Sequence, residues 1–170
     1  YGFPGPRRER GWHPGRIARA WAELRAGLGY DRYVAQGGDW GSLITPQLAL
    51  ADPEHCIGIH VNMLTPIPMT DDISAEEQAC LDSAVRFDQV DSGYFKEHAT
   101  KPQTIGYALD DSPVALAAWI LEKFRTWSDC DGDVERSYST DLLLDNLMTY
   151  WVTATAHSSA RLYYEFEHSL

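Results

Sequence analysis

The stretch "VAQGGDWGSLIT" (residues 34–45) decides the fold, because it joins a short apolar run to a helical run through three glycines and one aspartate. Tyr33–Gln36 predicts a short buried strand, and Trp40 to about Leu50 predicts a helix. Cys56–Asn62, which reads "CIGIHVN", predicts a second apolar strand. Strand, helix and strand within about 30 residues form a βαβ unit. The stretch therefore predicts an α/β fold with a parallel strand pair.

Residues 37–41, Gly-Gly-Asp-Trp-Gly, have the pattern small, any, nucleophile, any, small. A strand that turns at once into a helix strains the backbone of the central residue, and we expect Gly37 and Gly41 to be small for lack of space. Such a turn exposes Asp39 at the carboxyl edge of the sheet, and the backbone N–H of Trp40 becomes half of an oxyanion hole. The alternative is an ordinary tight turn in which Asp39 only caps the helix.

An aspartate at this position points to one kind of reaction. Its carboxylate is already ionised at neutral pH, so Asp39 needs no base in order to attack. Attack on a saturated carbon gives an alkyl ester, which water can later cleave, whereas a serine would give an ether. The residue type therefore favours substrates with a leaving group on saturated carbon, which are epoxides or alkyl halides.

The rest of the chain is predicted to be mainly helical. Ile17 to Leu28 has helical spacing and ends at Gly29, whereas the proline-rich residues 64–72 suit a connection. Four later helices are predicted from serines at their N-terminal ends, namely Ser74 (with Glu77 in a capping box), Ser112, Ser139 and Ser158. Residues 1–63 thus resemble part of an α/β core, and residues 64–170 a helical layer. Two strands cannot form a stable sheet alone, so we expect further strands from elsewhere.

Composition narrows the class of protein. The 170 residues are 44% hydrophobic, which allows a packed core, and the net charge of −11 comes without a cluster of basic residues beyond Arg7, Arg8 and Arg10. Nucleic acid and anionic membranes are therefore not expected as partners. Three widely spaced cysteines form neither a disulfide framework nor a metal site, which favours a reducing, cytoplasmic location. We expect no cofactor and no metal, and see neither a signal peptide nor a membrane span.

Three stretches carry a family resemblance: residues 11–45, residues 58–63 ("GIHVNM") and residues 99–129 ("ATKPQTIGYALDDSPVALAAWILEKFRTWSD"). They resemble the microsomal and juvenile-hormone type epoxide hydrolases of the α/β-hydrolase superfamily, and the resemblance covers essentially the whole chain. It implies a partial α/β-hydrolase core with the nucleophile elbow in residues 1–63, followed by a helical cap, or lid, domain in residues 64–170.

The resemblance also implies site residues. Asp39 takes the place of the family's nucleophile, and two cap tyrosines that hydrogen-bond the epoxide oxygen fall on Tyr94, in "GYFKEHATKPQT", and Tyr163, in "SARLYYEF". Tyr164 is the alternative if the register differs by one residue. A phenol suits this role because it stays protonated at neutral pH yet can share its proton with an alkoxide. The implied reaction converts a small apolar epoxide into a vicinal diol through an alkyl-aspartate ester.

The second half of the family's reaction needs a histidine and an acid that activate water. The resemblance places both after residue 170, and places the segment with the other oxyanion donor before residue 1. None of the six histidines lies in a matching motif: His60 falls on a strand, and we interpret the others as surface residues. We therefore expect a central fragment that performs alkylation without turnover. Any N-terminal membrane anchor would lie upstream, and the oligomeric state is left open.

Two alternatives remain at this stage. A haloalkane dehalogenase shares the aspartate elbow, and there the indole of Trp40 and a second tryptophan (Trp119, Trp127 or Trp151) would hold the halide. The tyrosine pair favours the epoxide reaction. The other alternative is a truncated, catalytically inactive remnant, which the short sheet with its exposed apolar edge would favour.

Overall fold

The computed structural model describes residues 9–64 and 72–169. Within these ranges the chain divides into two compact units, Gly11–Gly93 and Tyr94–His168. Most of the predicted connection at residues 64–72 falls on residues 65–71, outside the described residues. The predicted division into residues 1–63 and 64–170 therefore stays a prediction.

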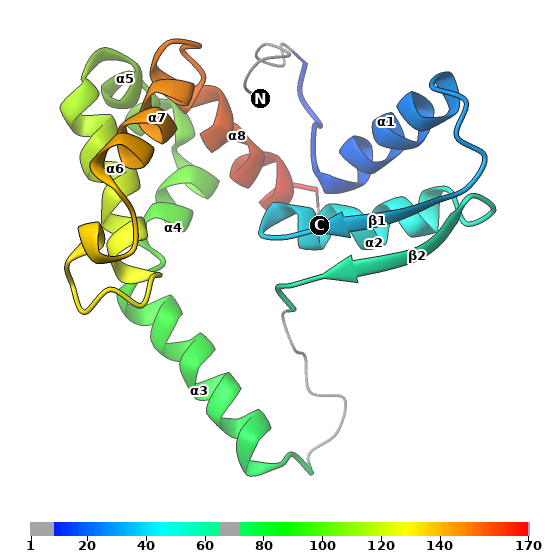
Figure 1. Cartoon of the computed structure of the whole chain (residues 1–170), viewed down its shortest axis with the longest axis horizontal. Coiled ribbons are helices and arrows are strands. Elements are labelled where there is room, and N and C mark those ends of the chain that lie inside the picture. The colour runs from blue at the N-terminus through cyan, green and yellow to red at the C-terminus, as the bar shows by residue number, and fades with distance from the viewer. Residues whose placement is uncertain (1–8, 65–71, 170) are drawn as a thin grey trace. The chain divides into compact units, whose positions relative to one another are not determined.

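The first unit contains the predicted βαβ arrangement. Its first four elements are α1 (Pro14–Gly27), β1 (Tyr33–Gly37), α2 (Trp40–Ala51) and β2 (Cys56–Val61), coloured blue to green in Figure 1. The strands β1 and β2 are parallel neighbours, and they form a two-stranded sheet in the described part of the chain. Both predicted strands, the helix between them and their parallel pairing are confirmed.

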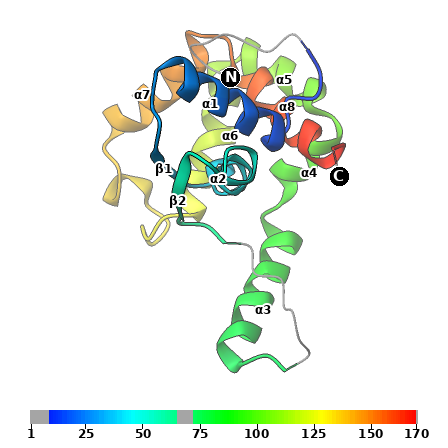
Figure 2. The same cartoon turned by 90° about the vertical axis from the view of Figure 1, so that its right-hand side faces the viewer.

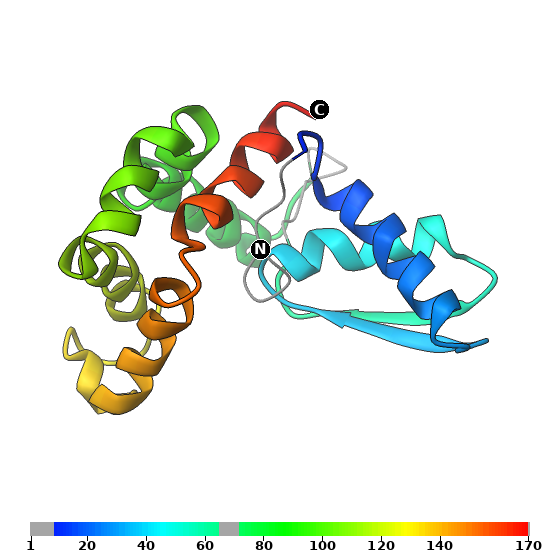
Figure 3. The same cartoon turned by 90° about the horizontal axis from the view of Figure 1, so that it is seen from above.

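Helices α1 and α2 cover the same side of the strand pair. Helix α2 packs against β1, β2 and α1, and Figures 2 and 3 show α1 and α2 together on one side of the strands. Ala18 of α1 and Thr45 of α2 are buried in this layer. Val34, Ile57 and Ile59 are exposed, at 65%, 55% and 44% of their surfaces. The described part of the sheet therefore retains an open apolar surface.

A polar network ties α1 and α2 to the start of β1. The carboxylate of Asp52 accepts a hydrogen bond from the Tyr33 hydroxyl at 3.0 Å, pairs with the Arg25 guanidinium at 3.0 Å and contacts Nδ1 of His55 at 2.5 Å. The hydrogen bond with His55 lowers the pKa of Asp52 below its usual value. Burial, followed by the hydrogen bond to Asp52, raises the pKa of Tyr33 to about 12. The network stabilises the end of the strand pair at which β1 begins.

Helix α3 (Ala75–Val90) begins with the predicted capping box. The Ser74 hydroxyl accepts a hydrogen bond from the Glu77 backbone N–H at 3.2 Å, and the Glu77 carboxylate accepts one from the Ser74 backbone N–H at 2.7 Å. These bonds lower the pKa of Glu77. No residue of α3 is buried, so local capping contributes to a helix that lacks a buried face.

The second unit is helical. It contains α4 (Gly93–Thr100), α5 (Pro102–Asp111), α6 (Pro113–Thr126), the short 3-10 helix η1 (Val134–Arg136), α7 (Thr140–Trp151) and α8 (Ala156–Glu167). Four of these helices, α5 to α8, each contribute one buried residue to a shared core, which consists of Leu109, Leu116, Leu147 and Ala156. This unit therefore has a hydrophobic core of its own.

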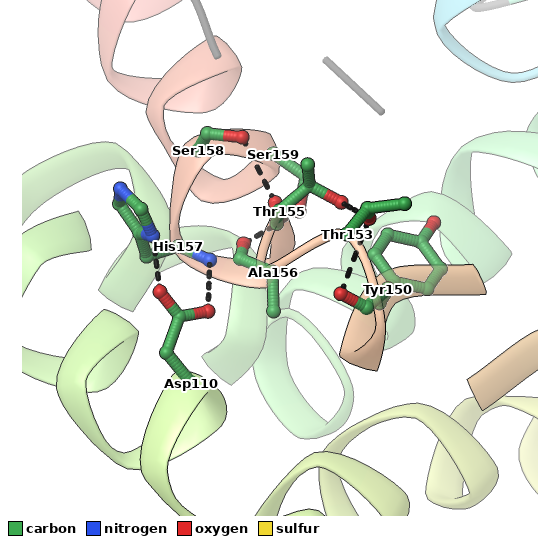
Figure 4. Close-up of polar contacts among 8 residues, drawn as sticks. All are labelled: Asp110, Tyr150, Thr153, Thr155, Ala156, His157, Ser158 and Ser159. Atoms are coloured by element: carbon green, nitrogen blue, oxygen red, sulfur yellow. Dashed lines mark hydrogen bonds and ion pairs between the residues drawn. The ribbon is translucent and has the colours of Figure 1, made fainter. Parts of the chain in front are cut away.

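The caps of α6 and α7 are confirmed, but the predicted start of α8 is wrong. Ser112 and Ser139 accept hydrogen bonds from the backbone at the starts of α6 and α7. Helix α8 begins at Ala156, and Ser158 lies inside it, where its hydroxyl donates to the Thr155 carbonyl at 3.0 Å. Figure 4 shows the reason: the Asp110 carboxylate accepts the His157 backbone N–H at 3.3 Å and also pairs with the His157 imidazole. A side chain from α5 thus caps α8.

Helices α5 and α8 approach each other closely at this point. A Cβ atom added to Gly106 of α5 would lie 2.6 Å from Cβ of His157. Glycine is required here because any larger residue would separate the two helices. Among residues 9–64 and 72–169, no helix combines the length and the apolar composition that crossing a membrane requires.

Candidate active site

Asp39 occupies the sharp turn between β1 and α2. Its backbone has φ 51° and ψ −125°, whereas an ordinary N-cap residue has an extended conformation. A non-glycine residue in this region is strained by about 1–3 kcal/mol. The turn nevertheless exposes the Asp39 side chain at the carboxyl end of β1. Asp39 is thus the N-cap residue of α2, but with the strained backbone that a nucleophile elbow predicts and an ordinary cap does not need.

The tight side of the elbow is Gly37. A Cβ atom at Gly37 would lie 2.2 Å from the carbonyl oxygen of Gly41 and 2.4 Å from Oγ1 of Thr45. A Cβ atom at Gly38 would lie 2.5 Å from Oδ1 of Asn62, at the end of β2. The expectation of a small residue for lack of space is therefore correct at Gly37. At Gly41 it is not, because a Cβ atom there meets nothing within 4 Å.

The Asp39 carboxylate is held by the first backbone N–H of α2. Its Oδ1 atom accepts a hydrogen bond from the Trp40 N–H. An N-cap side chain usually accepts from the second or third residue of the helix instead. The Trp40 N–H is the donor that the sequence predicted for the oxyanion hole. This N–H therefore binds Oδ1, and Oδ2 is the oxygen of the carboxylate that it does not bind.

Tyr94 and Tyr163 lie together in the helical unit, although they are far apart in sequence. Tyr94 is near the start of α4 and Tyr163 is on α8, and their ring centroids are 5.8 Å apart in an edge-to-face arrangement. Phe95 packs against Tyr163, with centroids 5.3 Å apart. The adjacent Tyr164 lies outside this ring cluster and stacks on His168 at 3.9 Å. The structure thus brings Tyr163, rather than Tyr164, to Tyr94.

His98 is the residue that sequence reasoning missed. It lies on α4, one helical turn after Tyr94, and its ring contacts both tyrosines, at 6.0 Å from Tyr94 and 4.8 Å from Tyr163. It is 7% exposed, so its interpretation as a surface residue was wrong. The available signal was the four-residue spacing from Tyr94, which places both residues on one face of a helix.

The hydrogen bond of His98 fixes its protonation. The indole N–H of Trp119 donates to Nε2 of His98 at 3.0 Å, and an indole can only donate. Nε2 must therefore be unprotonated, and the single ring proton lies on Nδ1, which has no hydrogen-bond partner within the described residues. Burial lowers the pKa of His98 to about 4. The imidazole is therefore neutral at physiological pH.

A cation lies beside the same ring cluster. The Lys123 ammonium, on α6, is 5.0 Å from the ring centroid of Tyr94 and 5.6 Å from that of Trp127. Only 14% of the Lys123 side chain is exposed, and its ammonium pairs with the Glu122 carboxylate at 2.8 Å. Ammonium groups over aromatic faces are attracted by the ring quadrupole. Lys123 is therefore fixed close to Tyr94.

Two histidine–carboxylate pairs occur elsewhere in the described structure. His55 pairs with Asp52 at the end of the strands opposite the elbow, because Tyr33, which binds Asp52, precedes Gly37 by four steps of about 3.3 Å. His157 pairs with Asp110 at the start of α8 and is only partly exposed. Both pairs join secondary-structure elements. Within the described residues, no group of three or more metal-ligating side chains is placed to hold a metal ion.

Known proteins resemble this chain along nearly its whole length. It is 50% identical over 168 residues to a protein of Stigmatella aurantiaca that is provisionally named an epoxide hydrolase, and 36% identical over 188 residues to epoxide hydrolase 1 of Sus scrofa. Each alignment covers 97% of this chain but only 38% and 41% of the relative. No family model matches the chain.

The structural comparison agrees with the sequence comparison. The crystal structure of juvenile hormone epoxide hydrolase from the silkworm Bombyx mori superimposes with a TM-score of 0.83 and 37% identity, over 93% of this chain and 42% of that one. The chain thus spans about two fifths of the length of the proteins it matches. The predicted fold class, part of an α/β-hydrolase core together with cap helices, is confirmed. In sequence and in fold, this chain is homologous to a part of the epoxide hydrolases of the α/β-hydrolase superfamily.

Proposed function

We propose that this chain carries the alkylating half of an epoxide hydrolase. Oδ2 of Asp39 attacks a ring carbon of the epoxide, the bond from that carbon to the epoxide oxygen breaks, and an alkyl ester of Asp39 forms. The oxygen released from the ring receives a proton from a tyrosine hydroxyl, and water later returns a proton to the phenolate. The product of this step is a hydroxyalkyl ester on Asp39.

The observation that carries this proposal is the backbone of Asp39. Strain at φ 51° is retained in a turn that exposes the carboxylate and presents the Trp40 N–H to Oδ1. Strained, over-determined residues concentrate at functional sites. The same N–H would stabilise the oxyanion that forms on Oδ1 when water attacks the ester, so one donor serves both carboxylate and ester.

The aromatic cluster supports an epoxide rather than an alkyl halide as substrate. Two phenols lie in one cluster, with ring centroids 5.8 Å apart, and phenols suit hydrogen bonding to an oxygen that becomes basic as the ring opens. A dehalogenase would need a second tryptophan N–H for the halide. The N–H of Trp119 already donates to His98. Trp151 packs against the hydrophobic core of the helical unit.

The substrate class follows from the surroundings of the tyrosines. Tyr94 and Tyr163 lie among aromatic rings, and the imidazole of His98 that contacts both is uncharged, so a small apolar epoxide is the proposed substrate. A cytoplasmic location is part of the proposal and is supported by three free cysteines, Cys56, Cys80 and Cys130. Activation of water is assigned to no residue of this chain.

Intact-mass measurement after exposure to styrene oxide tests the proposal. We expect the 170-residue chain to gain the mass of one styrene oxide molecule, and peptide mapping to locate the ester on Asp39. Asp39→Asn should abolish the adduct because a neutral amide is a poor nucleophile. Asp31→Asn is the matched control, since Asp31 is an exposed aspartate before β1.

The outcomes separate the possibilities. An adduct that persists in Asp39→Asn, or no adduct in a chain whose circular dichroism shows folded helices, would overturn the proposal. Chloride released from a chloroalkane by the unsubstituted chain, without an adduct from styrene oxide, would favour the dehalogenase. Failure of the chain to fold would favour the inactive remnant.

A further inference from the structure

Two glycines, Gly37 and Gly38, precede the strained Asp39, and each of them lies against a different element. A Cβ atom on Gly37 would meet the first turn of α2, with the Gly41 carbonyl oxygen at 2.2 Å. A Cβ atom on Gly38 would instead meet the side chain of Asn62, the residue that follows β2. The turn is therefore confined by α2 and by the end of the neighbouring strand.

Asn62 lies opposite Gly38 at the carboxyl edge of the strand pair. The parallel register pairs Gly37 with Val61, so the next residue of each chain segment stands at the same edge (Figure 1). The Asn62 backbone N–H donates to the Gly37 carbonyl at 3.4 Å, which continues the pairing by one residue. A Cβ atom on Gly38 would lie 2.5 Å from Oδ1, 3.2 Å from Cγ and 3.2 Å from Nδ2 of Asn62. The whole carboxamide thus lies against Gly38.

The contact between Asn62 and Gly38 is one of packing. The Asn62 side chain is exposed, and its carboxamide has no hydrogen-bond partner among residues 9–64 and 72–169. The φ of Gly38 is not positive, so glycine is required there for space rather than for an unusual backbone conformation. What Asn62 contributes to the turn is therefore the volume and the branched shape of its side chain.

This volume bears directly on the strain at Asp39. A strained residue persists only where its surroundings prevent relaxation. A change in the φ of Asp39 swings the peptide group that joins it to Gly38, because that peptide group moves as one plane. Gly37 is held from the side of α2, where the Ser42 hydroxyl donates to its carbonyl at 3.2 Å. The Asn62 carboxamide fills the space into which Gly38 would otherwise move.

We propose that Asn62 is a positioning residue for the nucleophile: its carboxamide packs against Gly38 and holds Asp39 in the strained conformation that exposes the carboxylate. This inference rests on the proposed function for the reaction of Asp39, whereas its conformational part can be measured without an epoxide. Asn62 acts through Gly38 and by shape. A side chain of the same branched shape should therefore replace it, and a shorter one should not.

Nuclear magnetic resonance of the 170-residue chain tests the conformational part. A residue with positive φ has its amide proton close to its own Hα, so we expect a strong nuclear Overhauser effect between these protons in Asp39. Asn62→Ala should weaken this effect because the turn can relax. Asn62→Leu should retain it, since two methyl groups replace Oδ1 and Nδ2. His60→Ala, which shortens an exposed side chain two residues earlier, is the matched control and should leave it unchanged.

The rate at which styrene oxide labels Asp39 tests the consequence for the reaction. Asn62→Ala should slow labelling by roughly tenfold, because small displacements of a reacting group cost large factors in rate. Its midpoint of urea unfolding should stay close to that of the unsubstituted chain, since the side chain is exposed. Asn62→Leu should restore most of the rate. A merely structural role would instead lower stability and labelling together.

A double variant gives the sharpest result. Gly38→Ala alone overlaps with the carboxamide, and Asn62→Ala alone leaves its space empty. In the combined variant the methyl group at residue 38 occupies that space, because alanine at residue 62 lacks the Oδ1, Cγ and Nδ2 atoms that obstruct it. The combined variant should therefore label faster than either single variant. Two reductions that simply multiply would overturn the inference, as would an unfolded Asn62→Ala or one that labels at the unsubstituted rate.

Failure of this inference and failure of the proposed function give different results. If styrene oxide alkylates Asp39 equally fast with and without the Asn62 side chain, the proposed function stands and the inference fails. If the Overhauser effect of Asp39 responds to Asn62 as expected but no adduct forms, the proposed function fails. Asn62 then keeps only its role in the conformation of the turn.

Discussion

Substitution of Gly37 by alanine is the sharpest test of the elbow. The added Cβ atom would lie 2.2 Å from the Gly41 carbonyl oxygen, whereas real Cβ contacts essentially never fall below 3.0 Å. The strand end and the first turn of α2 would therefore have to separate by 3.0 − 2.2 = 0.8 Å. Both contacting groups, Gly37 and the Gly41 carbonyl, belong to the backbone, so no side-chain rotation relieves the overlap. Glycine is required at residue 37 for space, because its φ is not positive.

The expected cost lies at the upper end of the range for overpacking, about 3 kcal/mol. Because each 1.4 kcal/mol changes an equilibrium constant tenfold, the unfolded fraction of the Gly11–Gly93 unit should rise by roughly 150-fold. Alkylation of Asp39 should fall as well, because movement of the turn carries the Trp40 N–H away from Oδ1. The two effects have one structural cause and should appear together.

Gly41→Ala is the matched control. It adds the same methyl group four residues later, where nothing lies within 4 Å, and its φ is not positive. Alanine should leave stability unchanged or raise it by less than about 1 kcal/mol, since alanine is the better helix former. Urea unfolding followed by circular dichroism, together with the rate of styrene oxide labelling, measures both variants. The reasoning is refuted if Gly37→Ala matches Gly41→Ala within about 0.5 kcal/mol and is labelled as fast.

Two further predictions concern the helical unit. Asp110→Ala should reduce the stability of the helical unit in urea by about 1–2 kcal/mol, because the start of α8 loses its cap. Asp111→Ala, a substitution at the exposed neighbouring residue, should have little effect. Equal effects of the two substitutions would refute a capping role for Asp110. His98 has a folded-state pKa of about 4, below the usual 6.5, so between these values the unfolded chain binds more protons and stability should rise with pH. The shift of 2.5 pH units corresponds to about 3 kcal/mol of unfolding free energy. His98→Gln should remove this contribution from the pH dependence of urea unfolding. A variant whose unfolding free energy changes with pH as steeply as that of the unsubstituted chain would contradict the burial argument.

Local chemistry explains what the sequence predicted. The strained turn was predictable because an aspartate between glycines, after a strand and before a helix, specifies one backbone path. The caps at Ser74, Ser112 and Ser139 were predictable because each hydroxyl binds a backbone N–H three residues later. In each case the interacting groups lie within a few residues, so the order of residues contains the interaction.

Contacts between distant segments account for the errors. Helix α8 begins before Ser158 because Asp110, 47 residues before His157, supplies the cap. His98 is buried because Trp119 and Tyr163, from two other helices, pack against it. Neither partner can be identified from the neighbouring sequence. The pairing of Tyr94 with Tyr163 was anticipated only through the family resemblance, because 69 residues separate them.

The two parts of the proposed site depend on different kinds of contact, one local in sequence and one between distant helices. Asp39 and its N–H donor depend on one short, strained turn, in which Gly37 allows almost no substitution. The two tyrosines meet instead through packing between helices, and the Lys123 ammonium reaches the Tyr94 ring from another helix. Substitution on α6 can therefore change the surroundings of Tyr94 without disturbing the turn that holds Asp39. The proposed nucleophile is fixed by the backbone, whereas the surroundings of the proposed proton donors are set by side chains that can change one at a time.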